Sequence, residues 1–66
     1  MNLRINGEVQ QQPAPCSVAQ LVEQLQLAGK RLAVERNGEI VPRSTYTDTW
    51  LADGDQLEIV QAIGGG

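Results

Sequence analysis

Two Asn-Gly pairs, at positions 6–7 and 37–38, constrain this chain more than any other feature of its sequence. Both central residues of a type I′ turn need positive φ, which Asn and Gly tolerate, so each pair predicts a two-residue β-hairpin. Apolar and polar residues alternate on either side of the pairs, as in strands with one buried face. The expected strand pairs are 2–6 with 8–12 and 31–36 with 39–41.

One amphipathic helix is predicted between the two hairpins, after Pro13 and Pro15 have ended the first. Ser17 followed by Gln20 is a capping-box pattern, in which each side chain bonds a free amide at the helix start. Apolar residues then recur at the helical spacing, at positions 18, 21, 22 and 25. We expect Gly29 to end the helix in the left-handed conformation, after about three turns.

The segment after the second hairpin is polar until a last strand. Pro42 cuts the second hairpin short, and residues 43–50 predict a loop or short helical turn. Either Trp50 or Leu51 is expected to anchor that loop. An Asp-Gly turn at 53–54 leads into a final strand over 56–63, with Leu57 and Ile59 pointing inward.

This order of elements predicts one α+β domain over residues 1–66, a mixed sheet that curls around one helix. A chain of 66 residues has room for a single small core. The return of the chain through the helix favours a last strand that lies parallel to the first, in the sheet centre.

Most conventional functions have no support in the composition. The chain has no His, one Cys and no Gly-rich loop with a phosphate-binding Lys, so we expect no metal site, no catalytic triad and no bound cofactor. The net charge of −3 and five scattered cations argue against nucleic acid and anionic membranes as partners. The N-terminus lacks the blocks of a signal peptide, which predicts a cytoplasmic protein.

Four side chains remain as isolated candidates. Cys16 precedes the helix, where a thiol can become reactive, but no His or second Cys accompanies it, so we favour a structural role. Asp53 and Asp55 flank a glycine and are interpreted as turn formers rather than a catalytic pair. Trp50 is either an interface anchor or, as we favour, packed under the polar loop.

The end of the chain is more informative. Val60 and Ala62 are expected on the open face of the sheet beside the tail, and with Ile40 they form a predicted docking surface. The chain then finishes with Gly64, Gly65 and Gly66, a segment without side chains that we expect to be flexible. Such a segment can enter a narrow channel and present its carboxylate there.

The whole chain resembles the ThiS family, the sulfur carrier proteins of thiamine thiazole biosynthesis. The most specific parts are "NGEIVPR" at 37–43, "DGD" at 53–55 and the terminal Gly-Gly. The resemblance implies a β-grasp, ubiquitin-like fold and a protein that is a co-substrate rather than an enzyme. A terminal Gly-Gly alone also fits a molybdopterin-synthase small subunit or a ubiquitin-like protein modifier.

The resemblance also implies the chemistry. A ThiF-like adenylyltransferase, with its own ATP and Mg²⁺, would adenylate the carboxylate of Gly66. Sulfur from a cysteine desulfurase relay would convert the adenylate to a thiocarboxylate, from which thiazole synthase would take the sulfur. Gly65 and Gly64 would be recognised as the tail threads into these partners.

Overall fold

The computed structural model describes residues 1–13 and 15–61 of the chain. These residues form five strands, one α-helix and one 3₁₀ turn, in the expected order. The elements are β1 (Asn2–Ile5), β2 (Glu8–Gln11), α1 (Val18–Gln24), β3 (Leu32–Arg36), β4 (Glu39–Ile40), η1 (Arg43–Thr45) and β5 (Gln56–Gln61).

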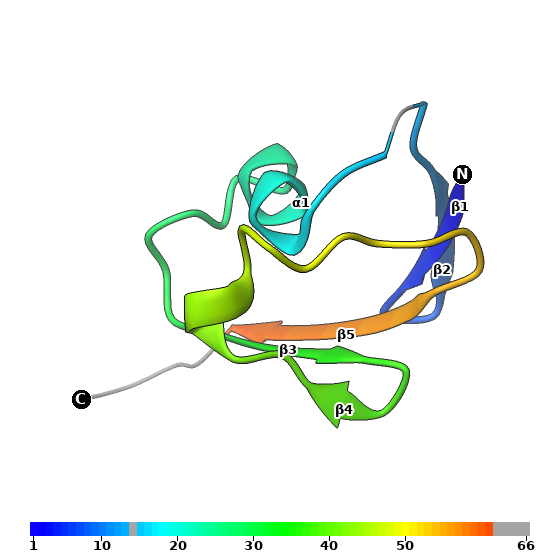
Figure 1. Cartoon of the computed structure of the whole chain (residues 1–66). Coiled ribbons are helices and arrows are strands. Elements are labelled where there is room, and N and C mark those ends of the chain that lie inside the picture. Colours follow the sequence, from blue (N-terminus) through cyan, green and yellow to red (C-terminus); the bar gives the residue numbers. More distant parts are fainter. Residues whose placement is uncertain (14, 62–66) are drawn as a thin grey trace.

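The strands make one mixed sheet in the order β2-β1-β5-β3-β4. β5 lies parallel to β1 and antiparallel to β3, and the two hairpins flank this centre. Figure 1 shows α1 lying across one face of the sheet while the other face stays open. The predicted parallel pairing of the first and last strands is therefore confirmed.

Both Asn-Gly turns have the backbone that the sequence predicts. Asn6 and Gly7 have φ of 51° and 85°, and Asn37 and Gly38 have 52° and 85°. Positive φ at both central residues defines the type I′ turn, whose twist matches that of the flanking strands. β4 has only two residues because Pro42, which cannot donate to a ladder, follows soon after it.

The helix begins with the predicted capping box. The Ser17 Oγ accepts a hydrogen bond from the Gln20 N–H at 3.2 Å, and the Gln20 Oε1 accepts one from the Ser17 N–H at 3.0 Å. These bonds satisfy two amide groups that the first helical turn leaves without partners. Val18, Leu21 and Val22 then turn into the core.

The end of the helix differs from the prediction. α1 spans seven residues, about two turns rather than three. Gln26, with φ of 61°, takes the left-handed position, and the Leu27 N–H donates to the Val22 carbonyl at 2.9 Å. This is a Schellman motif, so Gly29 does not end the helix; its φ of 82° serves a second turn further on.

The segment after β4 contains the expected short helical turn, η1. Leu51 anchors it, since this side chain is only 6% exposed. Trp50 is 55% exposed, so the interpretation of Trp50 as packed under the loop is wrong. Its backbone forms an isolated antiparallel bridge with Ser17, which ties the loop to the helix start and turns the indole outward.

Aliphatic side chains from every layer fill the core between sheet and helix. Burial of this apolar surface is the main stabilising term for so small a domain. The buried hydrophobic residues are Leu3, Ile5, Cys16, Val18, Leu21, Val22, Val34, Val41, Leu51, Leu57 and Ile59.

Candidate functional site

β5 is the last described element before the glycine-rich end of the sequence. Ala62, Gly64, Gly65 and Gly66, which the sequence singles out, lie outside the described residues. Gln61 ends the described part of β5, with Leu32 of β3 opposite it. The geometry around β5 therefore defines how the domain presents its C-terminal end.

The side chain of Asn6 extends the pairing of β5 beyond the end of β1. Its amide nitrogen donates to the Ile59 carbonyl at 3.1 Å, and its Oδ1 accepts the Ile59 N–H at 2.8 Å. A parallel ladder would give that N–H to the main-chain carbonyl of Asn6, but the left-handed turn redirects it. The carboxamide thus takes the place of the next peptide group.

The open face of the sheet carries two of the predicted docking residues. Val60 is 58% exposed and Ile40 is 64% exposed. Ile40 lies opposite Glu35, which lies opposite Glu58, so both apolar side chains share one face with these two carboxylates. Val9, 61% exposed, is a further apolar side chain on this face, across from Arg4 and on the far side of β1 from β5. The alternation of its strand could have identified it.

The two aspartates of the 53–55 turn have separate structural roles. Asp53 accepts the N–H of Asn2 at 2.6 Å at the surface. Asp55 is 7% exposed and accepts the Ala52 N–H, the Asn37 amide and the Arg36 guanidinium. Asp55 thus bonds an amide of its own turn, whereas Asp53 bonds the start of β1. The salt bridge between Asp55 and Arg36 joins β3 to the start of β5.

Opposing effects act on the Asp55 carboxyl. Burial tends to raise its pKa, but hydrogen bonds from Ala52, Asn37 and Arg36 and the charge of Arg36 outweigh the burial. The net result is a pKa below the ordinary value. A carboxylate held in its charged form by its own domain is a structural group rather than a proton donor.

Cys16 agrees with the structural interpretation. The side chain is 3% exposed and belongs to the hydrophobic core, and burial raises the pKa of its thiol. A raised pKa lowers the fraction of reactive thiolate at neutral pH. The thiol is therefore a small core group.

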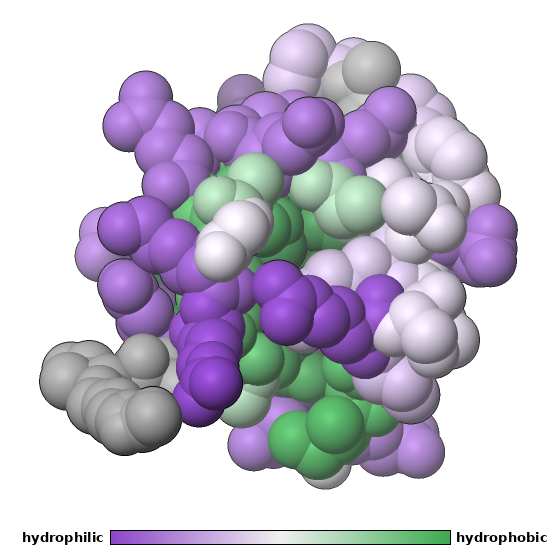
Figure 2. Space-filling view, turned by 90° about the vertical axis from the view of Figure 1, so that its left-hand side faces the viewer, coloured by the Kyte–Doolittle hydropathy of each residue, from purple (hydrophilic) through white to green (hydrophobic). Residues whose placement is uncertain are grey.

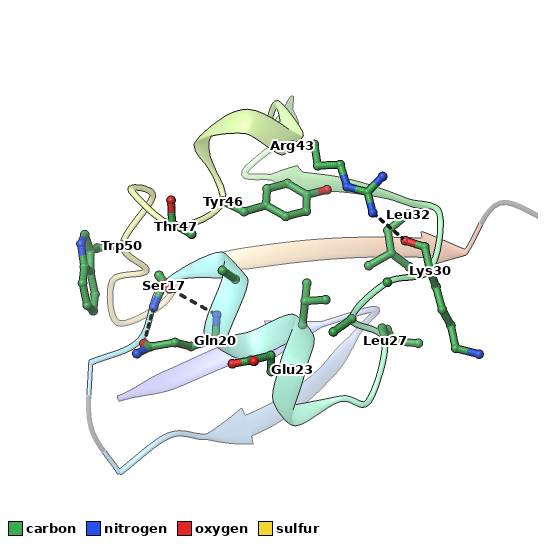
Figure 3. A pocket seen from close by; sticks show the side chains of 14 residues that line it. Ser17, Gln20, Glu23, Leu27, Lys30, Leu32, Arg43, Tyr46, Thr47 and Trp50 are labelled. Atoms are coloured by element: carbon green, nitrogen blue, oxygen red, sulfur yellow. Dashed lines mark hydrogen bonds between the residues drawn. The ribbon is translucent and has the colours of Figure 1, made fainter.

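A groove of about 560 Å³ separates α1 from the η1 segment, the 27–30 loop and the start of β3 at Leu32. Figure 2 shows hydrophobic surface recessed among hydrophilic side chains on this side of the domain. In Figure 3 the Tyr46 ring lies along the groove, and the Arg43 guanidinium donates to the Lys30 carbonyl at 3.3 Å. Ser17 lines one end of the groove, where its Oγ accepts the Gln20 N–H of the capping box.

Within residues 1–13 and 15–61, no three His, Cys, Asp or Glu side chains gather as a metal site would require. No helix of this part of the chain is long and apolar enough to span a membrane.

The sequence model of the ThiS family matches residues 3–66. The chain belongs to the ThiS family. Sulfur carrier protein ThiS of Bacillus subtilis (strain 168) is 37% identical over 65 residues, covering 97% of this chain and 98% of that protein. That relative is named a carrier, which agrees with the expectation that a ThiS domain is not an enzyme.

A solved ThiS structure confirms the β-grasp fold. The crystal structure of thiamine biosynthesis protein ThiS from Geobacter metallireducens matches with a TM-score of 0.85 at 33% identity, covering all of both chains.

A longer relative contains a ThiS-like segment. The thiazole synthase of Paramagnetospirillum magneticum (strain ATCC 700264 / AMB-1) is 48% identical over 66 residues. The match covers this whole chain, which spans 20% of that relative's length.

Proposed function

We propose that this chain is a sulfur carrier protein of thiamine biosynthesis and that its reacting group is the carboxylate of Gly66. The observation that carries the proposal is the end-to-end similarity to a protein named sulfur carrier protein ThiS. The family match also runs through residue 66, the last of three consecutive glycines. The β-grasp domain then supplies recognition, and the tail supplies the reacting atoms.

Activation of the tail is the first chemical step. A carboxylate is a poor electrophile because its charge repels nucleophiles and oxide is a poor leaving group. A ThiF-like adenylyltransferase supplies ATP and Mg²⁺; a carboxylate oxygen of Gly66 attacks the α-phosphate, and pyrophosphate leaves. The product is an acyl-adenylate whose leaving group is AMP.

Sulfur enters at the carbonyl carbon of Gly66. A persulfide from a cysteine desulfurase relay attacks this carbon and AMP leaves; a thiol then cleaves the sulfur–sulfur bond and a thiocarboxylate remains. Glycine suits this step because no side chain crowds the carbonyl. Gly65 and Gly64 also lack side chains. A channel in the partner therefore needs to be only wide enough for the main chain of the tail.

Thiazole synthase is the proposed acceptor of the sulfur. The relative from P. magneticum supports this, because a segment similar to this chain forms part of a protein named thiazole synthase. A donor and an acceptor joined in one chain would meet at high effective concentration. A separate carrier must instead dock through its own surface.

The open sheet face is the proposed docking surface. Val60 presents apolar area near the end of β5, Ile40 adds apolar area on the same face two strands away, and Ala62 is assigned to this surface from the sequence alone. Exposed apolar side chains beside a reacting tail can anchor a partner while the tail enters its channel.

Intact mass spectrometry tests the proposal. The chain is incubated with a ThiF-like adenylyltransferase, Mg²⁺ and ATP, and then with a persulfide source and thiol. We expect an AMP adduct first and replacement of one oxygen by sulfur second, both absent from a variant that lacks Gly66. Absence of both products with an adenylyltransferase that modifies its own carrier would overturn the proposal.

A further inference from the structure

The hydrogen-bond register of β5 leaves one main-chain edge open at the root of the tail. Asn37 N–H donates to the Gln56 carbonyl at 2.7 Å, which fixes 56, 58 and 60 as the residues whose main chain points towards β3. The main-chain groups of Asp55, Leu57, Ile59 and Gln61 therefore point to the opposite side, the side of β1.

β1 and the turn after it provide hydrogen-bond partners for these main-chain groups only as far as Ile59. The carbonyls of Asp55 and Leu57 accept the N–H groups of Arg4 and Asn6, both at 2.9 Å. The Asn6 carboxamide then bonds Ile59. In Figure 1, β5 continues past the hairpin of β1 and β2, and none of the five described strands follows on that side.

Gln61 consequently presents an edge. Hydrogen-bonded and non-hydrogen-bonded pairs alternate along an antiparallel ladder. Ala33 and Val60 form a hydrogen-bonded pair, so the next pair, Leu32 and Gln61, exchanges no main-chain hydrogen bonds. Among residues 1–13 and 15–61, no group pairs with the Gln61 N–H or C=O, and the residue is exposed. An exposed strand edge of this kind is a template for another strand.

We propose that the adenylylating partner adds an extended main-chain segment to this edge, with hydrogen bonds to the N–H and C=O of Gln61. The inference rests on the proposed function, because it assigns how the tail root is held while Gly66 reacts. The residues beyond the edge are mostly glycine, so recognition of the tail must come largely from main chain. A partner segment with free N–H and C=O groups meets that requirement.

Asn6 confines this addition to the tail root. Its carboxamide already bonds the N–H and C=O of Ile59, so a partner strand cannot pair with β5 on the N-terminal side of Gln61. The open edge is thus one residue long in the described domain. Short edges resist pairing between copies of the same protein, which leaves this one for a partner that also binds the tail.

The register allows a selective test. Gln61→Pro removes the N–H on the open side and leaves the ladder to β3 intact, because that N–H takes no part in it. Gln61→Ala is the matched control, since it removes the side chain and keeps the N–H. An ester in place of the 60–61 amide, made by chemical synthesis, removes the N–H without the φ restriction of proline.

The readout is the KM for the carrier in adenylylation by a ThiF-like enzyme, with circular dichroism to verify the fold. We expect Gln61→Ala to match the unmodified chain, and both the proline and ester forms to raise KM about three- to tenfold, the effect of losing one hydrogen bond. Hydrogen exchange at the Gln61 amide is expected to slow in the complex.

Equal KM values for the alanine, proline and ester forms, together with fast exchange of the Gln61 amide in the saturated complex, would overturn the inference while leaving the proposed function intact. A chain that is not adenylylated at all, in any form, would instead overturn the proposed function and the inference with it.

Discussion

Arg36 Nε donates to Asp55 Oδ2 at 2.8 Å, and this contact joins the end of β3 to the start of the tail-bearing strand. Asp55 is buried, while the Arg36 side chain is 30% exposed, so the pair lies at the rim of the core. The Ala52 N–H and the Asn37 amide complete the coordination of the carboxylate. One carboxyl group therefore joins the end of β3 and its turn, at residues 36–37, to the 52–55 turn before β5.

Removal of this carboxylate is expected to destabilise the domain. Asp55→Ala leaves the Ala52 N–H and two side chains without their acceptor, which should cost about 2 to 3 kcal/mol of unfolding free energy. Asp53→Ala is the matched control: it loses one surface bond, and we expect a cost below about 1 kcal/mol. Urea denaturation measures both, and equal losses would contradict the assigned role of Asp55.

Stability should fall on acidification because the folded state lowers the pKa of Asp55. The stabilisation is fully present above the unfolded pKa of about 3.9 and is lost as pH falls through the lower folded value. Urea midpoints measured between neutral and strongly acidic pH should show this decline. Asp55→Asn, which cannot titrate, should flatten it, and a profile unchanged by that substitution would contradict the assignment.

Asn6 should stabilise β5 through its side chain and not only through its turn. Asn6→Gly keeps positive φ accessible but removes both bonds to Ile59, so we expect a loss of about 1 to 2 kcal/mol. Asn6→Asp keeps an acceptor for the Ile59 N–H, but a second carboxylate oxygen replaces the donor that faces the Ile59 carbonyl. Hydrogen exchange of the Ile59 amide should therefore accelerate in the glycine variant and remain slow in the aspartate variant.

Cys16 should react slowly with thiol reagents in the folded protein. Its burial limits access and raises the thiol pKa, so both effects lower the labelling rate at neutral pH. We expect labelling to follow unfolding, with urea restoring the rate of an exposed cysteine. Labelling of the folded chain at that exposed rate would contradict the core assignment.

Val60 should contribute to partner binding without contributing to stability. Val60→Asp places a charge on a side chain that is 58% exposed, so the urea midpoint should barely change while the KM for adenylylation rises about tenfold. Val9→Asp is the matched control, because Val9 is about equally exposed on the same face but lies on the other side of β5 from Ile40, level with Gln56 at the start of the strand. Equal KM increases for the two variants would contradict local docking at Val60, because added negative charge anywhere on this face would then explain the increase.

The elements of this fold were predictable because their signals are local. Asn-Gly pairs, a capping box and alternating apolar residues act over a few neighbours, and the hairpins and the helix start follow from them. The helix end was mispredicted, because Gln26 accepts a left-handed backbone once Leu27 can cap Val22. Glycine preference at such a position is a tendency that packing can override.

Trp50 and Asp55 show why surface and burial were harder to predict. Trp50 looked like an anchor by residue type, but its neighbour Leu51 faces the core and turns the indole outward. Asp55 is buried because Arg36 and Asn37, far away in sequence, offer it bonds. Such partners meet only when the strands assemble.

The sequence by itself determined the order of the elements, the absence of conventional active-site signals and the glycine end that the family resemblance explains. The tertiary structure alone decided which main-chain groups of β5 are satisfied, because a register is a relation between strands distant in sequence. The sequence predicts the turn at Asn6. Only in the folded sheet does the Asn6 carboxamide bond the main chain of Ile59, as a peptide group of a neighbouring strand would. The open edge at Gln61 exists for the same reason.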